Sequence, residues 1–120
     1  MNRPPDTKMQ KMKIYISGPI TGTADYIERF ARTEKHLSSS FGREGKIEIF
    51  NPVRHIINTL RNPEEIGWPF IMSVLLDELR YGNFTHIYLM QGWQSSEGAV
   101  IEKCYAKRLG MDFIYEIGRE

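Results

Sequence analysis

Four short runs of apolar, β-favouring residues are separated by longer segments along the chain. Glycine, proline or asparagine borders each run, and such residues mark turns and strand ends. The runs are short, continuous and rich in isoleucine, tyrosine and phenylalanine, which is typical of strands buried in a parallel sheet. They therefore predict strands over residues 13–17, 46–50, 86–90 and 111–115.

Apolar residues recur at helical spacing in the segments between these runs. Residues 25–28 have the form of a capping box and open a segment in which Tyr26, Phe30, Thr33 and Leu37 recur at helical spacing. A weak pattern over residues 53–60 indicates a short helix or turn. The other predicted helices run from Pro63 to about residues 81–82 and from the turn at residues 92–97 to about Leu109.

Alternating strands and helices predict an α/β fold: a small parallel sheet of four to five strands, right-handed crossovers and helices on both faces. At 120 residues, the chain suits a single domain over residues 13–120, preceded by a flexible tail over residues 1–12. The turns that follow the first and third strands should then meet at one edge of the sheet. Open α/β sheets bind their ligands at that edge.

Composition narrows the classes of partner. The net charge of +1 provides no general attraction to nucleic-acid polymers or to anionic membranes. No apolar run reaches the roughly 20 residues of a membrane-spanning helix, so we expect a cytoplasmic protein without a membrane partner. The single cysteine, Cys104, is predicted to be a small buried residue, and the Cys and His spacings suit no metal. We expect no cofactor.

The most informative stretch is GWQSSEGAVIE over residues 92–102, which leads from the third strand into a helix. Gly98 lies one turn before Glu102, and helical side chains lean toward the N-terminus. The Glu102 carboxylate should therefore have open space beside it. Two serines, Ser95 and Ser96, lie at the helix start, where free N–H groups and the helix dipole favour an anion. They predict that the substrate carries a phosphate group, although either serine could instead cap the helix.

Carboxylates dominate the candidate chemistry. No Ser-His-Asp pattern is present, whereas Glu102 and Asp77 could form a carboxylate pair that suits cleavage at a sugar anomeric carbon. Asp77 lies off the apolar stripe of its helix, which is also typical of a solvated position. Trp93 is a possible stacking surface for a ligand.

Two motifs carry a resemblance to a known family. The run YISGPITG over residues 15–22 and the run over residues 92–102, together with the helix from Trp68 to Asp77, resemble the DUF4406 type, an uncharacterised and often phage-associated family related to nucleoside 2-deoxyribosyltransferases. The resemblance covers roughly residues 13–115. It implies a flavodoxin-like or Rossmann-like fold and a nucleoside or nucleotide as the small-molecule partner.

The resemblance also implies roles for individual residues. Glu102 matches the glutamate that attacks C1′ and forms a covalent glycosyl-enzyme. Asp77 matches an acid that handles the proton of the departing base, and Ser96 matches a phosphate-contacting serine of the related 2′-deoxynucleoside 5′-monophosphate N-hydrolases. Thr21 and Thr85 depart from the pattern, because those relatives carry arginine and an acidic residue there. The full set expected to bind substrate is Tyr15, Gly18, Pro19, Thr21, Trp93, Ser95, Ser96 and Gly98.

Three functions follow as hypotheses. The first is an N-glycosyl transferase or hydrolase that acts on a nucleoside or its 5′-monophosphate. The second is a non-catalytic nucleotide-binding or sensing module with the same fold. The third is a small assembly protein in which Trp68 and Trp93 face another subunit. A homo-oligomer is expected, because a four-stranded sheet leaves edges and faces to cover.

Overall fold

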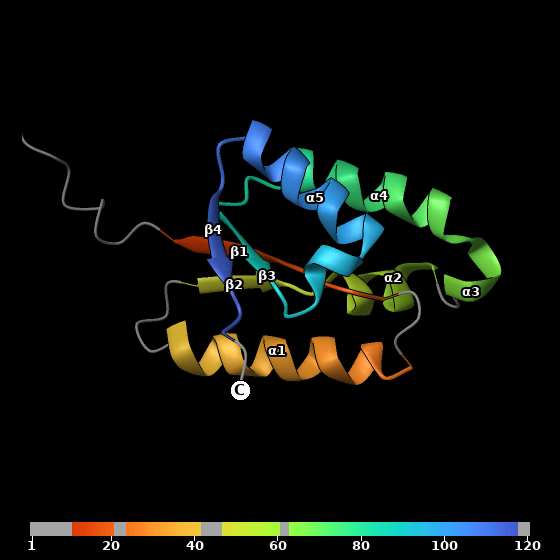
Figure 1. Ribbon diagram of the computed structural model, residues 1–120, viewed down its shortest axis with the longest axis horizontal. Coiled ribbons are helices and arrows are strands. Elements are labelled where there is room, and N and C mark those ends of the chain that lie inside the picture. The colour runs from red at the N-terminus through yellow and green to blue at the C-terminus, as the bar shows by residue number, and fades with distance from the viewer. Residues whose placement is uncertain (1–10, 21–23, 42–46, 61–62, 118–120) are drawn as a thin grey trace, which may run out of the picture.

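Four parallel strands form one sheet in the order β2-β1-β3-β4 (Figure 1). The computed structural model describes residues 11–20, 24–41, 47–60 and 63–117. The strands are β1 (Met12–Ser17), β2 (Ile47–Phe50), β3 (His86–Leu89) and β4 (Asp112–Tyr115). The predicted α/β class with a small parallel sheet is confirmed. The tail expected over residues 1–12 lies mostly outside the described residues, and its last residue, Met12, already belongs to β1.

Helices cover both faces of the sheet, as predicted. Figure 1 shows α1 on one side and the pair α4 and α5 on the other. This arrangement follows from right-handed crossovers, because the connection from β1 to β2 runs in the opposite direction from those that lead to β3 and β4. The helices are α1 (Tyr26–Phe41), α2 (Pro52–Leu60), α3 (Pro63–Ile66), α4 (Trp68–Tyr81) and α5 (Glu97–Arg108), with a 3-10 turn, η3, at Trp93–Ser95.

The helical region predicted from Pro63 to residues 81–82 is two helices instead of one. Gly67 separates α3 from α4 and has φ 101°, a conformation that residues with a side chain rarely adopt. The chain therefore turns at Gly67, and α4 starts anew at Trp68 with a proline next to it. The single apolar stripe in the sequence concealed this break, which places Trp68 at the beginning of a helix.

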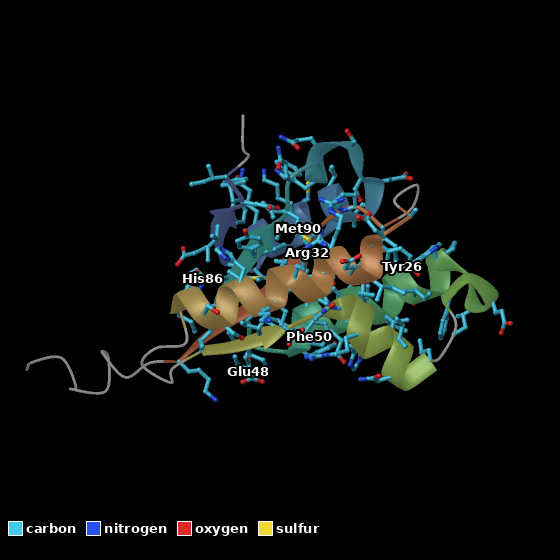
Figure 2. The ribbon with its side chains drawn as sticks, turned by 90° about the horizontal axis from the view of Figure 1, so that it is seen from below. Tyr26, Arg32, Glu48, Phe50, His86 and Met90 are labelled. Atoms are coloured by element: carbon cyan, nitrogen blue, oxygen red, sulfur yellow. The ribbon has the colours of Figure 1, made fainter. Side chains whose placement is uncertain are left out.

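Side-chain alternation along β1 divides the core between the two faces. Ile14 and Ile16 pack with Phe30 of α1 (Figure 2 shows this side of the molecule). Tyr15 faces the other way and packs with Leu79 of α4 and with Ala106 of α5. Because successive strand residues point to opposite faces, Ser17 follows Tyr15 toward the α4 and α5 side. The carboxyl-terminal end of β1 thus presents two hydroxyl groups, those of Tyr15 and Ser17, to that side.

The turns after β1 and β3 meet at one sheet edge, as predicted. The Met90 N–H donates to the Ser17 carbonyl at 2.8 Å and so extends the pairing of the two strands into the turns. A Cβ placed on Gly92 would lie 3.5 Å from Cγ of Pro19, so the two turns are in contact. Functional side chains delivered by either turn therefore share one location.

Within the described residues, no helix combines the length and the apolar character that crossing a membrane requires. Cys104 is exposed on α5, and the prediction that it is buried is wrong. Its position explains the error, since the buried stripe of α5 passes through Ala99, Glu102 and Ala106 and leaves residue 104 on another face.

Candidate functional site

A buried glutamate stands at the centre of the site. The buried stripe of α5 consists of Ala99, Glu102 and Ala106, so a carboxylate occupies a position that a helix usually gives to an apolar residue. The alanines are small and allow α5 to lie close to the sheet. Glu102 is 5% exposed. A buried acid is uncommon in proteins and needs hydrogen-bond or charge partners, because taking a charge out of water is unfavourable.

Two hydroxyl groups of β1 supply these partners. The Tyr15 hydroxyl donates to Oε2 of Glu102 at 2.6 Å, and Oγ of Ser17 donates to Oε1 at 2.7 Å. Each carboxylate oxygen therefore has one donor. Both donors come from alternate positions of a single strand, which fixes the distance between them to the spacing of a β-strand. The carboxylate is held in one orientation by groups that belong to the centre of the sheet.

Burial shifts the titration of Glu102 strongly. Removal from water raises the pKa of Glu102 from 4.5 to about 7, although the hydrogen bonds from Ser17 and Tyr15 act in the opposite direction. The carboxyl group thus changes its charge near neutral pH. Perturbed acids in clefts are frequent at functional sites.

The Tyr15 ring is fixed by its neighbours. It stacks on Phe50 with ring centroids 5.4 Å apart and meets the edge of Phe84 at the same centroid distance. Burial and the nearby Glu102 carboxylate raise the pKa of the Tyr15 hydroxyl well above its usual value. Tyr15 therefore keeps its proton and acts as a hydrogen-bond donor throughout the neutral range.

Glu102 lies in the wall of a cavity of about 650 Å³. This volume is within the range of pockets that bind small molecules. One part of the wall is apolar and comes largely from α4, and another is polar and comes from the start of α5. The described residues that line the cavity are Gly18, Ile20, Trp68, Pro69, Met72, Leu75, Ser95, Ser96, Glu97, Gly98, Ala99, Ile101 and Glu102.

The position of Gly98 on α5 is covered by a side chain of α4. A Cβ at this position would lie 3.2 Å from Sδ of Met72, so the thioether of α4 covers the glycine. The space beside Glu102 is therefore part of a cavity with a Met72 wall, and the absence of a side chain at Gly98 lets α4 and α5 approach each other. Methionine is flexible and can adapt its shape to a ligand.

The polar wall begins with the turn before α5. Gly92 has φ 91°, a left-handed conformation that suits glycine, and it leads into the 3-10 turn that contains Ser95. Oγ of Ser96 accepts a hydrogen bond from the Ala99 N–H at 3.2 Å, which makes Ser96 the N-cap of α5. Both serines line the cavity, and Ser96 also has this structural role.

The structure brings together most of the residues expected to bind substrate, and it places others elsewhere. Gly18, Ser95, Ser96 and Gly98 line the cavity with Glu102, and Tyr15 contacts Glu102 directly. Pro19 lies beside Gly92 in the neighbouring turn, outside the cavity lining. Thr21 lies outside the described residues.

Asp77 and Trp93 are two further expected site residues that do not line the cavity. Asp77 is exposed on α4, two residues beyond the buried Leu75, and does not line the cavity. Trp93 packs against the ring of Tyr115 at 6.2 Å, and the Lys103 ammonium lies 5.2 Å from its ring centroid. Trp93 therefore belongs to the side of the turn that faces β4.

Sequence reasoning missed three residues of the site. Ser17 was read only as the end of a strand, but its place two residues after Tyr15 is the signal that both face the same side. Trp68 is named in the sequence analysis only as the start of a matched helix and as a residue that could face another subunit, and in the structure it lines the cavity. Glu97 follows the cap residue Ser96 and contributes a second carboxylate to the wall, and its position in the first turn of α5 was visible in the sequence.

Within the described ranges, no group of three or more His, Cys, Asp or Glu side chains could hold a metal ion. The described residues of the site offer a buried carboxylate, a second carboxylate, hydroxyl groups and apolar surface.

Comparison with known proteins identifies a match to a protein family. The model of a family described as a domain of unknown function, DUF4406, matches residues 12–115. No curated protein and no solved structure matches the chain. The matched region extends from the start of β1 to the end of β4 and so contains Tyr15, Ser17 and Glu102.

Proposed function

The chain belongs to the DUF4406 family, and from the geometry of its site we propose that it cleaves or transfers the N-glycosidic bond of a nucleoside or nucleotide through a covalent glycosyl intermediate on Glu102. One observation carries the proposal. A buried carboxylate, oriented by two hydroxyl donors, lies in the wall of a cavity large enough for a nucleoside. The resemblance of the two sequence motifs to nucleoside 2-deoxyribosyltransferases supports the same assignment.

The proposed reaction has two steps. In the first, an oxygen of Glu102 forms a bond to C1′ while the bond from C1′ to the base nitrogen breaks. The electron pair of that bond leaves with the base, which takes up a proton. In the second step, water or an N–H nitrogen of another base displaces Glu102 from C1′ and gives up its proton to the carboxylate that protonated the departing base. The enzyme is a hydrolase if water reacts and a transferase if a base reacts.

The environment of Glu102 suits the transition state of this reaction. Cleavage at an anomeric carbon develops positive charge on the sugar, and an ionised carboxylate nearby stabilises that charge most in a site with little water. Tyr15 and Ser17 hold the carboxylate without neutralising it, since each donates a hydrogen bond and keeps its proton. The pKa of about 7 makes the reactive ionised form abundant above neutral pH.

A second carboxylate is needed where the departing base takes up a proton. Asp77, to which the resemblance gives this role, is exposed and does not line the cavity, whereas Glu97 does. Glu97 lies on the same helix as Glu102, at the polar end of the cavity. We therefore assign the proton transfer to Glu97 in this proposal.

The charges of the cavity favour an uncharged nucleoside over a 5′-monophosphate. The charged residues among the described lining are Glu97 and Glu102, and the lining includes no lysine, arginine or histidine. Two carboxylates repel a phosphate group, and the Ser96 oxygen already accepts a bond from the Ala99 N–H. The 5′-phosphate that the serines suggested in the sequence is thus the less favoured alternative.

A non-catalytic nucleoside-binding module is the second candidate. The observation in its favour is that both oxygens of Glu102 are hydrogen-bonded and that its pKa is about 7, so a large part of the carboxyl groups is protonated at neutral pH. A protonated acid could recognise a ligand without attacking it.

Base release separates the two candidates. The purified protein is incubated at pH 8 with each of the four common 2′-deoxynucleosides and their 5′-monophosphates, with and without a second base, and free base is measured by chromatography. We expect release that Glu102→Gln abolishes and that Glu97→Gln lowers by about 10²-fold, the usual contribution of a general acid. Asp77→Asn is the matched control and should leave the rate unchanged. Binding without any release would support the non-catalytic module.

A further inference from the structure

A second cavity, of about 200 Å³, lies on the face of the sheet opposite Glu102, between α1 and the carboxyl ends of β3 and β4. Tyr88 and Met90 belong to the core on the α1 side, and both line this cavity. Figure 2 views the molecule from that side and labels Arg32 and Met90 there. The proposed reaction makes no use of this cavity.

Basic side chains enter the second cavity from one face of α1. Arg29, Arg32 and His36 are three and four residues apart, so their side chains lie on the same face of the helix. Glu116, after β4, is the acid among the described residues of the lining. Two guanidinium groups therefore accompany one carboxylate, and the cavity carries an excess of positive charge. The described lining of the Glu102 cavity, by contrast, carries two carboxylates and no basic residue.

The contacts that these charged groups make among the described residues leave donors for a ligand. Nη2 of Arg29 donates to the Gln91 carbonyl at 3.2 Å, which holds the guanidinium beside the turn after β3. Nη1 of Arg32 pairs with Glu28 at 2.9 Å, but both side chains are exposed and such a pair contributes little stability. A guanidinium has five N–H donors, so each arginine retains several. The Gln91 N–H donates to the Glu116 carboxylate at 2.7 Å and holds it at the same turn.

The Tyr88 hydroxyl provides a further donor. Tyr88 is 6% exposed, and its hydroxyl makes no hydrogen bond to another described residue. Within the described part of the chain, no fully buried side-chain oxygen or nitrogen lacks a partner, so this hydroxyl is open to solvent beside the cavity that Tyr88 lines. Burial and the nearby Glu116 carboxylate raise the pKa of Tyr88 to about 12, which keeps the proton on the hydroxyl.

A wider groove continues from the second cavity along the same side of the sheet. It has a volume of about 480 Å³ and shares His36, Tyr88 and Glu116 with the cavity. The rest of its described lining is mostly apolar and includes Leu37, Ile114 and Ile117. A ligand with a charged head and an apolar body therefore fits across both.

We propose that the second cavity binds the phosphate group of a small phosphomonoester whose apolar body lies in the adjoining groove. A phosphate group has close to two negative charges and three terminal oxygens, which match two guanidinium forks and a hydroxyl donor. A carboxylate has a single charge and two oxygens. A volume of about 200 Å³ is below that of pockets that enclose a whole drug-sized ligand and suits a head group. Because the site lies across the sheet from Glu102, the inference is independent of the proposed reaction.

Binding is tested on the full chain with three probes: inorganic phosphate, phenyl phosphate and benzoate. Calorimetry is carried out at pH 8 and about 0.15 M sodium chloride, where attraction between distant exposed charges is screened. We expect phenyl phosphate to bind most tightly, inorganic phosphate more weakly and benzoate most weakly. In ¹H–¹⁵N spectra, phenyl phosphate should shift the amide signals of α1 and of Gln91 and leave those of residues 95–98 unchanged.

Substitutions of opposite sign give the second readout. Arg29→Gln should weaken the binding of phenyl phosphate roughly 10- to 150-fold, as expected for the loss of a bond to a charged group. Arg32→Gln should also weaken it and should keep the fold, because the Arg32 side chain is 63% exposed. Glu116→Gln keeps an oxygen for the Gln91 N–H and should strengthen binding. Lys35→Gln is the matched control, since Lys35 lies on α1 outside the cavity lining and its loss changes the net charge equally; the affinity should stay the same.

Circular dichroism and the thermal midpoint report whether each variant keeps its fold, and Arg32→Gln with Glu116→Gln decides the matter if Arg29→Gln does not fold. The inference is overturned by an absence of phenyl phosphate binding, by equal affinity for benzoate, by unchanged affinity in the arginine variants, or by shifts confined to residues 95–98. Equal weakening by Lys35→Gln and Arg32→Gln would also overturn it, because attraction to net charge alone would then explain binding. None of these measurements requires turnover, so the proposed reaction stands or falls separately.

Discussion

The hydroxyl of Tyr15 lies 2.6 Å from Oε2 of Glu102, although 87 positions separate the two residues in the chain. The contact joins β1, an inner strand of the sheet, to α5, the helix that follows β3. It fixes a carboxylate whose pKa is raised to about 7 by burial and is lowered by hydrogen bonds from Ser17 and from Tyr15. The direction in which the pKa of Glu102 changes when either donor is removed can therefore be predicted.

Loss of a hydroxyl donor should raise the pKa of Glu102 further. Both bonds favour the ionised form, and a bond to a charged group is worth about 1.5–3 kcal/mol, or on the order of one to two pKa units. Ser17→Ala and Tyr15→Phe should each move the rising limb of the pH profile of kcat/KM to higher pH by about one unit. Tyr15→Phe keeps the ring that packs on Phe50. A carboxyl ¹³C titration of Glu102 follows the same shift without turnover, and a shift to lower pH would contradict the assigned role of these bonds.

Stability should depend on pH through Glu102. Its folded pKa of about 7 lies above the value of 4.5 expected in the unfolded chain, so the folded state binds the proton more tightly. This contribution to stability is complete below pH 4.5 and is lost as the pH rises to about 7. Relative to Glu102→Gln, the wild type should lose about 2–3 kcal/mol of unfolding free energy between roughly pH 5 and pH 8. Urea denaturation of both proteins across this interval measures the difference, and a constant difference would show that Glu102 titrates normally.

Two glycines of the site should respond differently to alanine. A Cβ at Gly18 would lie 2.8 Å from Cβ of Met90, a distance that requires the two strand ends to move apart. Gly18→Ala should therefore lower the unfolding free energy by about 1–3 kcal/mol. At Gly98 the nearest atom is the flexible Sδ of Met72 at 3.2 Å, and alanine also favours a helix by about 1 kcal/mol.

Gly98→Ala should consequently change the unfolding free energy by less than about 1 kcal/mol, because the two effects oppose each other. The displaced Met72 side chain narrows the cavity, so KM should rise for a nucleoside. Denaturation curves and steady-state kinetics of both variants check the contrast. Equal destabilisation by the two substitutions would mean that Met72 cannot move.

Ser96 is expected to act mainly as a helix cap. Ser96→Ala removes the acceptor for the Ala99 N–H and should destabilise the protein by about 1 kcal/mol, whereas Ser96→Asp keeps an acceptor and should not. The ratio of kcat/KM for a deoxynucleoside and for its 5′-monophosphate should stay the same in Ser96→Ala. A wild type that prefers the monophosphate, with the preference eroded in Ser96→Ala, would instead assign the serine to a phosphate.

Several features of the fold were predictable because they depend on local patterns. Apolar runs and helical spacing located all four strands and the helices that cover them. The turn after β3 and the helix with Glu102 were predictable for the same reason. The break at Gly67 was not, since a glycine in a helical pattern does not reveal whether its φ is positive.

The composition of the cavity depended on contacts that periodicity does not encode. The sequence does not distinguish the roles of Trp68 and Trp93. The 3-10 turn at Trp93–Ser95 directs Trp93 toward β4, whereas the start of α4 places Trp68 at the cavity. The partner of Glu102 at Ser17 also required knowledge of how α5 lies on β1. Asp77 stays a prediction from the resemblance, on an exposed part of α4.

Covalent trapping tests the central claim most directly. The protein is incubated at pH 8 with deoxynucleosides that carry fluorine at C2′, which slows breakdown of a glycosyl-enzyme, and intact mass and peptide mass spectrometry follow. The account predicts one added fluorinated deoxyribosyl group on Glu102, absent from Glu102→Gln and present in Asp77→Asn. A wild-type protein that releases base without any adduct on Glu102, or that carries the adduct on Glu97, would contradict it.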